Sequence, residues 1–87
     1  MKNRERLAES GYEDAVVFEN PDFDSAIIGV TTDNRVVYDL NKMIEHLAEE
    51  DGIDRIEALE FIEYNTLRAC PYFDGAPIVI ESWVDEM

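Results

Sequence analysis

The side chains best placed to do chemistry in this sequence are carboxylates that recur every three or four residues. On a helix this spacing sets neighbouring carboxylates about 5–6 Å apart, which is close to the repeat of phosphates along one nucleic-acid strand. Such a row could attract a basic protein by imitating a nucleic-acid backbone, although any solvated helix face also collects glutamate. The six candidate partner-binding residues are Glu45, Glu49, Asp54, Glu57, Glu60 and Glu63.

The other reactive side chains form no recognisable catalytic or metal-binding motif. His46 is the only histidine and lies beside the apolar stripe of its helix, so a solvated or rim position is expected. Cys70 is the only cysteine, so it cannot form an internal disulfide and is expected to be a small buried side chain near a helix end. Nothing in the spacing of these two residues indicates a catalytic dyad. The loop acids Asp22, Asp24 and Asp74 lack EF-hand spacing. We therefore expect no enzymatic activity, no cofactor and no metal.

Two helices joined by a turn at Asp51-Gly52 would position the carboxylates. Gly52 can adopt the left-handed conformation that ends a helix, and Asp54 with Glu57 forms a capping box for the next one. The first helix carries an apolar stripe, and the second, from residue 55 to about 67 or 69, is apolar most of the way round, which predicts cover on more than one side. The apolar residues expected to pack on a sheet, leaving the glutamates exposed, are Met43, Ile44, Leu47, Ile56, Leu59 and Ile62.

Short runs of β-branched residues predict the strands. We expect strands at 15–18 and 77–81, and a hairpin of 26–31 with 35–39 whose two-residue loop is Asp33-Asn34. The predicted class is α+β: a small, mainly antiparallel sheet of three or four strands with a two-helix hairpin packed on one face. Residues 1–12 are expected to be a flexible or helical leader, 13–84 a single α+β domain, and 85–87 an acidic tail. The N-terminal leader or a second copy of the chain could shield the open face of the sheet, and the second alternative predicts a homodimer.

Charge limits the classes of partner. The sequence has 21 acidic and 7 basic residues, a formal net charge of -14, and three of the bases come before residue 7. A body this acidic is repelled by nucleic acid and anionic membranes and attracted to basic protein surfaces. No run approaches the ~18 apolar residues of a membrane span. We expect a cytoplasmic protein whose partner is a basic protein surface, with no direct binding to nucleic acid or membrane.

Residues 47–59, LAEEDGIDRIEAL, resemble the helix-turn-helix portion of ribbon-helix-helix repressors, in which a strand also precedes the helices. This resemblance implies a dimeric regulator or antitoxin. In that family the strand carries basic and polar residues that enter the major groove, whereas residues 35–39 offer one base.

The wider stretch from residue 12 to residue 80 resembles small acidic proteins of gut bacteria and their phages, a family without an assigned activity. The matching segments are Ala26–Val30, Val36–Asp39, Glu63–Ala69, Pro71-Tyr72 and Pro77-Ile78. We interpret the chain as a non-enzymatic acidic protein-interaction module. Its most specific form is a nucleic-acid-mimic inhibitor of a basic nucleic-acid-binding protein, such as a phage protein that blocks a bacterial nuclease. The alternative is a ribbon-helix-helix-like dimeric regulator or antitoxin.

Overall fold

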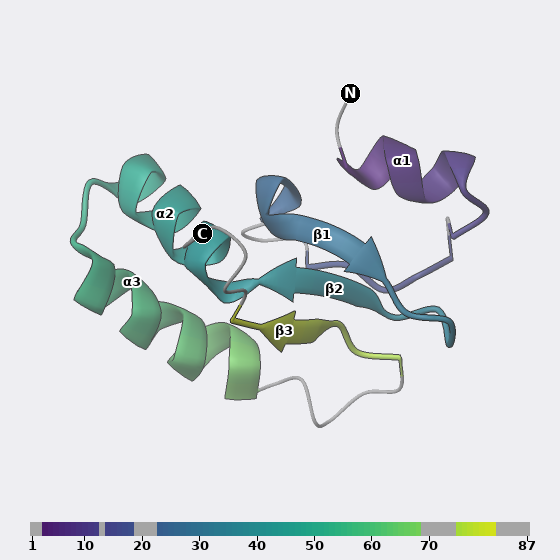
Figure 1. Ribbon diagram of the computed structural model, residues 1–87. Coiled ribbons are helices and arrows are strands. Elements are labelled where there is room, and N and C mark those ends of the chain that lie inside the picture. The colour runs from purple at the N-terminus through teal and green to yellow at the C-terminus, as the bar shows by residue number, and fades with distance from the viewer. Residues whose placement is uncertain (1–2, 13, 19–22, 69–74, 82–87) are drawn as a thin grey trace.

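The computed structural model describes residues 3–12, 14–18, 23–68 and 75–81 and confirms the α+β class (Figure 1). A short helix precedes a hairpin, a helix pair follows, and a third strand completes the sheet. The elements in chain order are α1 (Asn3–Glu9), η1 (Asp24–Ala26), β1 (Ile27–Val30), β2 (Val36–Asp39), α2 (Leu40–Asp51), α3 (Arg55–Phe61), η2 (Ile62–Thr66) and β3 (Ile78–Ile80).

The sheet has three strands in the order β1-β2-β3. β1 and β2 are antiparallel, as a hairpin requires, and β2 and β3 are parallel. The sequence predicted a mainly antiparallel sheet, and the second pairing differs from it. The connection makes this pairing possible: α2, α3 and η2 all lie between β2 and β3, and parallel strands need a long, usually helical crossover.

The hairpin is where the sequence placed it, but its loop is one residue longer than predicted. The Thr31 N–H donates to the Arg35 carbonyl at 2.8 Å, and the Asn34 N–H donates to the Thr31 carbonyl at 3.1 Å. Asn34 has a φ of 69°, so residues 32–34 form a three-residue loop that ends in a left-handed residue. A two-residue loop of the expected kind needs positive φ at both central residues, and among the described residues of this loop only Asn34 has it.

The predicted strand at 15–18 is wrong, because this segment has no strand conformation. Instead it lies against the sheet through its side chains. The Phe18 ring packs on Tyr38 with centroids 4.6 Å apart, and the Phe18 N–H donates to the Tyr38 hydroxyl at 3.0 Å. A backbone N–H that donates to a side chain is unavailable for a strand ladder. The periodicity of an apolar run does not show that such a side-chain bond will form. The residues that follow, Asn20-Pro21-Asp22, are typical of a turn by their types, and they lie outside the described residues.

One core joins the sheet to the helices. Tyr38, Phe23, Met43, Ile62 and Val36 are among its largest fully buried side chains. α1 contributes Leu7, which is 7% exposed, and is anchored at its start by the side-chain amide of Asn3, which donates to the carbonyl oxygens of Asp24 and Ile27 at 2.8 and 3.2 Å.

The helix pair lies at the end of the sheet where β2 and β3 finish (Figure 1). α2 follows β2 without a loop, and α2 and α3 pack chiefly on each other, with η1 against α2. The prediction that the pair packs across one face of the sheet is not confirmed. A sheet of strands three or four residues long is too small to lie under two helices at once.

Candidate functional site

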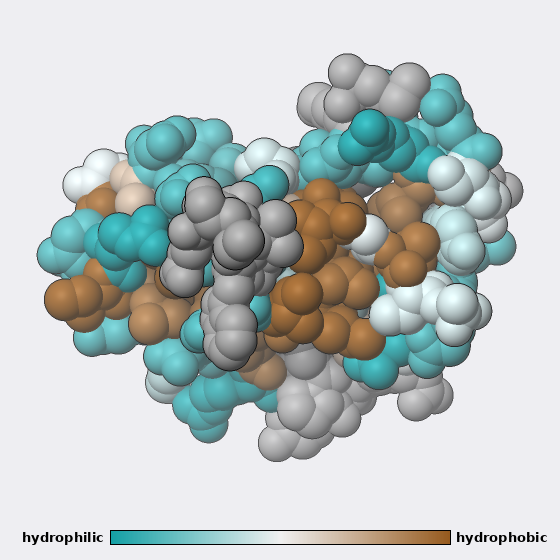
Figure 2. Space-filling model, viewed as in Figure 1, coloured by the Kyte–Doolittle hydropathy of each residue, from teal (hydrophilic) through white to brown (hydrophobic). Residues whose placement is uncertain are grey.

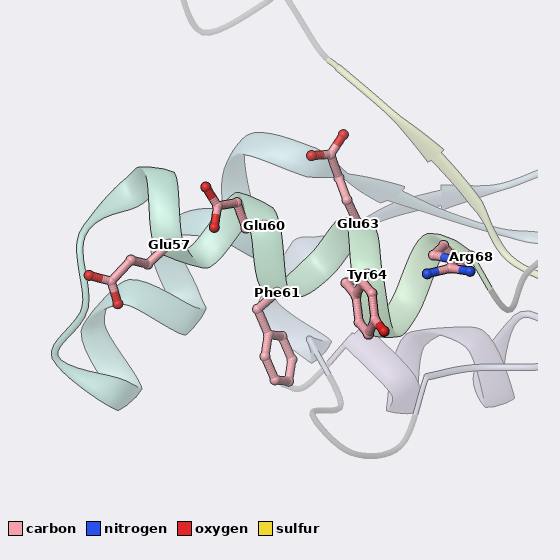
Figure 3. A pocket seen from close by; sticks show the side chains of 6 residues that line it. All are labelled: Glu57, Glu60, Phe61, Glu63, Tyr64 and Arg68. Carbon is pink, nitrogen blue, oxygen red and sulfur yellow. The ribbon is translucent and has the colours of Figure 1, made fainter.

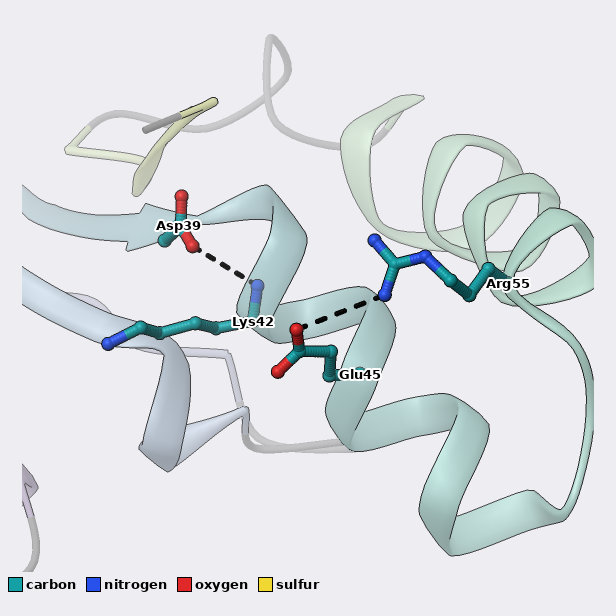
Figure 4. A network of polar contacts seen from close by, with 4 residues as sticks. All are labelled: Asp39, Lys42, Glu45 and Arg55. Carbon is teal, nitrogen blue, oxygen red and sulfur yellow. Dashed lines mark hydrogen bonds and ion pairs between the residues drawn. The ribbon is translucent and has the colours of Figure 1, made fainter. Parts of the chain in front are cut away.

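α2 has the two-sided character that the sequence predicted. Met43, Ile44 and Leu47 are 0%, 5% and 3% exposed, while Glu45 and Glu49 lie on the exposed side. Asp39 caps the start of the helix, because its carboxylate accepts from the Lys42 N–H at 3.2 Å (Figure 4). It ends at Gly52, which has a φ of 65° and takes the predicted left-handed conformation. Both ends of α2 are therefore fixed by local chemistry.

α3 starts at the predicted cap, since the Asp54 carboxylate accepts from the Glu57 N–H at 2.8 Å. Ala58 and Ile62 are fully buried, but Ile56, which was expected to pack on the sheet, is 71% exposed. Tyr64 is 68% exposed. The prediction that this helix is covered on more than one side is therefore wrong. α2 covers one side of α3, and the small sheet does not cover the other.

The helix continues through η2, where a π-helical turn covers Ile62–Thr66. The side-chain amide of Asn65 donates to the carbonyl of Phe61 at 3.1 Å. A π turn adds a residue to the helical repeat, so it changes the angle at which later side chains leave the helix, and such turns are frequent at functional sites. The predicted extent from residue 55 to residue 67 is thus confirmed, and the predicted alternative end at residue 69 lies outside the described residues.

A shallow depression of about 750 Å³ lies along α3 and η2 (Figure 3). We call its lining the α3 face. Phe61 and Tyr64 project to the same side of the helix in this view, and Glu60 and Glu63 project to the other. The Arg68 guanidinium lies 4.9 Å from the centre of the Tyr64 ring, within cation–π distance. The residues of the α3 face are Glu57, Glu60, Phe61, Glu63, Tyr64 and Arg68.

All six predicted carboxylates are exposed, but they do not form one row. Glu57, Glu60 and Glu63 meet at the α3 face, and Asp54 is used to cap α3. The two on α2 do not belong to this face. Glu45 lies 3.9 Å from Arg55 (Oε1 to Nη1), a pair more than half exposed on both sides and hence weak (Figure 4). The structure therefore brings together three of the six.

The remaining candidates are placed only in part. His46 is half-buried at the rim, as predicted, with its ring 5.9 Å from that of Phe23 in an edge-on contact. Asp24 belongs to η1 and accepts from the Asn3 N–H at 3.1 Å. Asp22, Asp74 and Cys70 lie outside the described residues. Within the described ranges, no three His, Cys, Asp or Glu side chains are grouped to hold a metal ion, and no helix is long and apolar enough to cross a membrane.

Sequence reasoning missed the exposed aromatic residues of this site. Phe61 and Tyr64 count among the apolar residues for which the second helix was expected to be covered on more than one side. A usable signal was present: Ala58 and Ile62 are four residues apart and define one buried stripe, and Tyr64 falls away from it. Comparison of the chain with protein-family models, curated proteins and solved structures finds no match. We therefore infer function from the chemistry of the site itself.

Proposed function

We propose that this protein is a non-enzymatic, acidic protein-interaction module that binds a basic protein through the α3 face. The observation that carries the proposal is the combination of exposed aromatic side chains and carboxylates on one helix. Phe61 and Tyr64, 38% and 68% exposed, line the same depression as Glu57, Glu60 and Glu63, with the rings on one side of the helix and Glu60 and Glu63 on the other (Figure 3). Aromatic residues are frequent anchors of protein interfaces, and surrounding charges select the partner and speed association.

The spacing of the carboxylates supports a partner that binds nucleic acid. Glu57, Glu60 and Glu63 follow one another at three-residue steps, which on a helix surface correspond to about 5–6 Å. The net charge of -14 adds a long-range field of the sign that nucleic acid has. The module would thus act as a nucleic-acid mimic that occupies the binding surface of its target. A cytoplasmic location, where such a target would be met, is part of this proposal.

The pairing of β2 favours this function over the ribbon-helix-helix alternative. β2 is the strand that directly precedes the helix pair, so it occupies the place of the strand that forms the dimer ribbon in those repressors. Here it pairs with β1 on one edge and with β3 on the other. A second subunit could reach neither edge without displacing a strand of the same chain. The acidic surface also disfavours contact with phosphates.

The decisive experiment uses two charge-matched triple variants. Glu57→Gln/Glu60→Gln/Glu63→Gln removes the carboxylates of the α3 face, and Glu5→Gln/Glu9→Gln/Glu50→Gln removes the same charge from exposed positions elsewhere. Each tagged protein is used to capture basic proteins from bacterial lysate, and duplex DNA is then added as competitor. We expect capture by the parent and the control triple, release by DNA, and loss of capture by the α3-face triple.

Equal capture by both triple variants would refute the α3 face as the binding surface. If DNA does not release the captured proteins, the proposal of a protein-interaction module would stand and the proposal of nucleic-acid mimicry would be refuted. A gel-shift measurement at 50 mM salt addresses the alternative, because the parent protein should not retard duplex DNA. Retardation that weakens steeply with salt would favour the dimeric regulator instead.

A further inference from the structure

A second groove, of about 470 Å³, lies between α1 and β1, away from the α3 face. Its lining is apolar at Leu7, Tyr12, Ile28 and Val30, and the surface beneath α1 is correspondingly brown in Figure 2. None of the described residues that line it is acidic, in a chain with 21 acids among 87 residues. The volume is that of a ligand-binding groove, and the lining combines these apolar side chains with polar and basic ones.

Two cations of the groove have no ion-pair partner within the described residues. Arg6 extends from α1 and Lys42 from the first turn of α2, and both are exposed. Figure 4 shows the Lys42 side chain extending away from the carboxylates of Asp39 and Glu45. The described lining of the groove therefore carries two positive charges and no negative one, in an acidic protein. A negatively charged ligand could form ion pairs with Arg6 and Lys42, because no described acid of this protein already does so.

β1 presents an open strand edge to this groove. It is the outer strand of the sheet, next to β2 only. Because the Thr31 N–H bonds to Arg35, the adjacent pair of Val30 and Val36 is of the non-hydrogen-bonded type, so the N–H and C=O of Val30 point away from β2. At the other end of β1, the Asn3 amide already occupies the carbonyl of Ile27. Unpaired groups on an edge strand are a template for a further strand.

We propose that this groove binds an extended acidic peptide segment of a partner protein, added as a strand along β1. The peptide backbone pairs with Val30. Alternate side chains of a strand point to opposite faces, so one set packs on the apolar floor at Ile28 while carboxylates of the other set reach Arg6 and Lys42. The site is independent of the α3 face, which has the opposite charge and binds the opposite kind of partner.

The test uses a fluorescein-labelled peptide of alternating acidic and valine residues, DVEVDVE, titrated with the full chain and followed by fluorescence anisotropy. Salt of 0.15 M, at which the Debye length is about 8 Å, screens the remote acids of the protein. We expect saturation below about 1 mM and binding about tenfold weaker for QVQVQVQ. A peptide methylated on alternate backbone nitrogens, in both registers, should lose binding to a similar degree, because it cannot extend the sheet.

Charge-matched variants locate the site. Arg6→Gln/Lys42→Gln should bind DVEVDVE only as well as the parent binds QVQVQVQ. Arg55→Gln/Arg68→Gln makes the same change in net charge at the start of α3 and just after η2, outside the groove, and should leave the affinity within about twofold. In ¹⁵N spectra of the parent, the amides of Ile28 and Val30 should shift on titration. Circular dichroism verifies that both variants are folded.

Three results would overturn the proposal. They are no saturation with DVEVDVE up to about 1 mM, equal affinity of the parent and methylated peptides, and equal loss in the two double variants. The last result would show that the peptide responds only to overall charge. Loss of capture at the α3 face would not bear on this site, since neither the proposed peptide contacts nor the Arg6→Gln/Lys42→Gln variant involve that face.

Discussion

Two isoleucines of the same helical run, Ile56 and Ile62, can be used to test which side of α3 is covered. The test compares the loss of stability when each is replaced by alanine. Ile62 is 0% exposed and belongs to the core shared with the sheet, whereas Ile56 is 71% exposed. Replacing each by alanine removes the same three carbon atoms. Any difference between the two variants therefore reports burial and not chemistry.

The expected costs differ by about tenfold. Three fully buried carbons at about 0.8 kcal/mol each give Ile62→Ala a transfer loss of about 2.4 kcal/mol, and the cavity that remains raises the cost to roughly 3–4 kcal/mol. Ile56→Ala loses less than a third of that burial, about 0.7 kcal/mol, and gains roughly 0.4 kcal/mol because alanine favours the helix more than isoleucine does. The net cost of Ile56→Ala is therefore close to zero.

Urea unfolding followed by circular dichroism at 222 nm measures both costs. With a slope of about 1 kcal/mol per M for a domain of this size, Ile62→Ala should lower the midpoint by about 3 M and Ile56→Ala by less than about 0.5 M. Midpoints that fall by the same amount would refute the exposed position of Ile56 and restore a helix covered on both sides. A changed slope would mean that a variant altered the unfolded state. The slopes of the two variants and the parent are therefore compared before the midpoints.

Three further predictions concern charge and capping. Raising NaCl from about 0.01 to about 0.1 M shortens the Debye length from about 30 to about 10 Å and should raise the melting temperature, because 21 acids repel one another in a compact body; a flat or falling melting temperature would mean that attractive pairs dominate. Asp54→Ala removes the acceptor of the Glu57 N–H and should lower the free energy of unfolding, measured in urea, by about 0.5–2 kcal/mol. Asp54→Asn keeps a side-chain acceptor and should therefore keep most of the stabilisation by this cap. Glu57→Gln/Glu60→Gln/Glu63→Gln should leave the free energy of unfolding unchanged or raise it by a few tenths of a kcal/mol per site, and a loss beyond 1 kcal/mol would show that these side chains make stabilising contacts.

The local signals in the sequence predicted the helix pair and the hairpin well. Gly52 and Asp54 mark a helix end and a helix start by their own backbone and side-chain chemistry, which needs no distant residue. The prediction of a strand at 15–18 was wrong because strand formation, in contrast, needs a distant residue. Whether an apolar run becomes a strand depends on a partner strand, and here Phe18 meets the Tyr38 hydroxyl instead. The parallel pairing of β3 likewise depends on the path of the whole crossover.

The candidate site was predicted in its charges but not in its shape. Carboxylates are exposed almost regardless of fold because burial of an unpaired charge is costly, so their exposure could be expected from the sequence. Which apolar side chains are exposed beside them could not be predicted, since the sequence alone does not distinguish Ile56 and Phe61 from Ile62. Only the position of α2 and the π turn at η2 separate the buried residue from the exposed ones.

The α3 face is most readily explained by a cost to the free protein that a partner would remove. Three like charges at three-residue steps weaken their own helix, and exposed aromatic rings leave apolar surface in water. Within the described residues, Arg68 is the cation of this face, and it stacks on Tyr64. Stability alone would favour glutamine at the acidic positions and small or polar residues at the aromatic ones. A basic partner would reverse each of these costs at once, because it neutralises the carboxylates and covers the rings, and the binding free energy would then be added to the stability of the folded state. The same residues that make the free α3 face less stable are thus the ones that would make a complex with a basic protein both fast to form and specific.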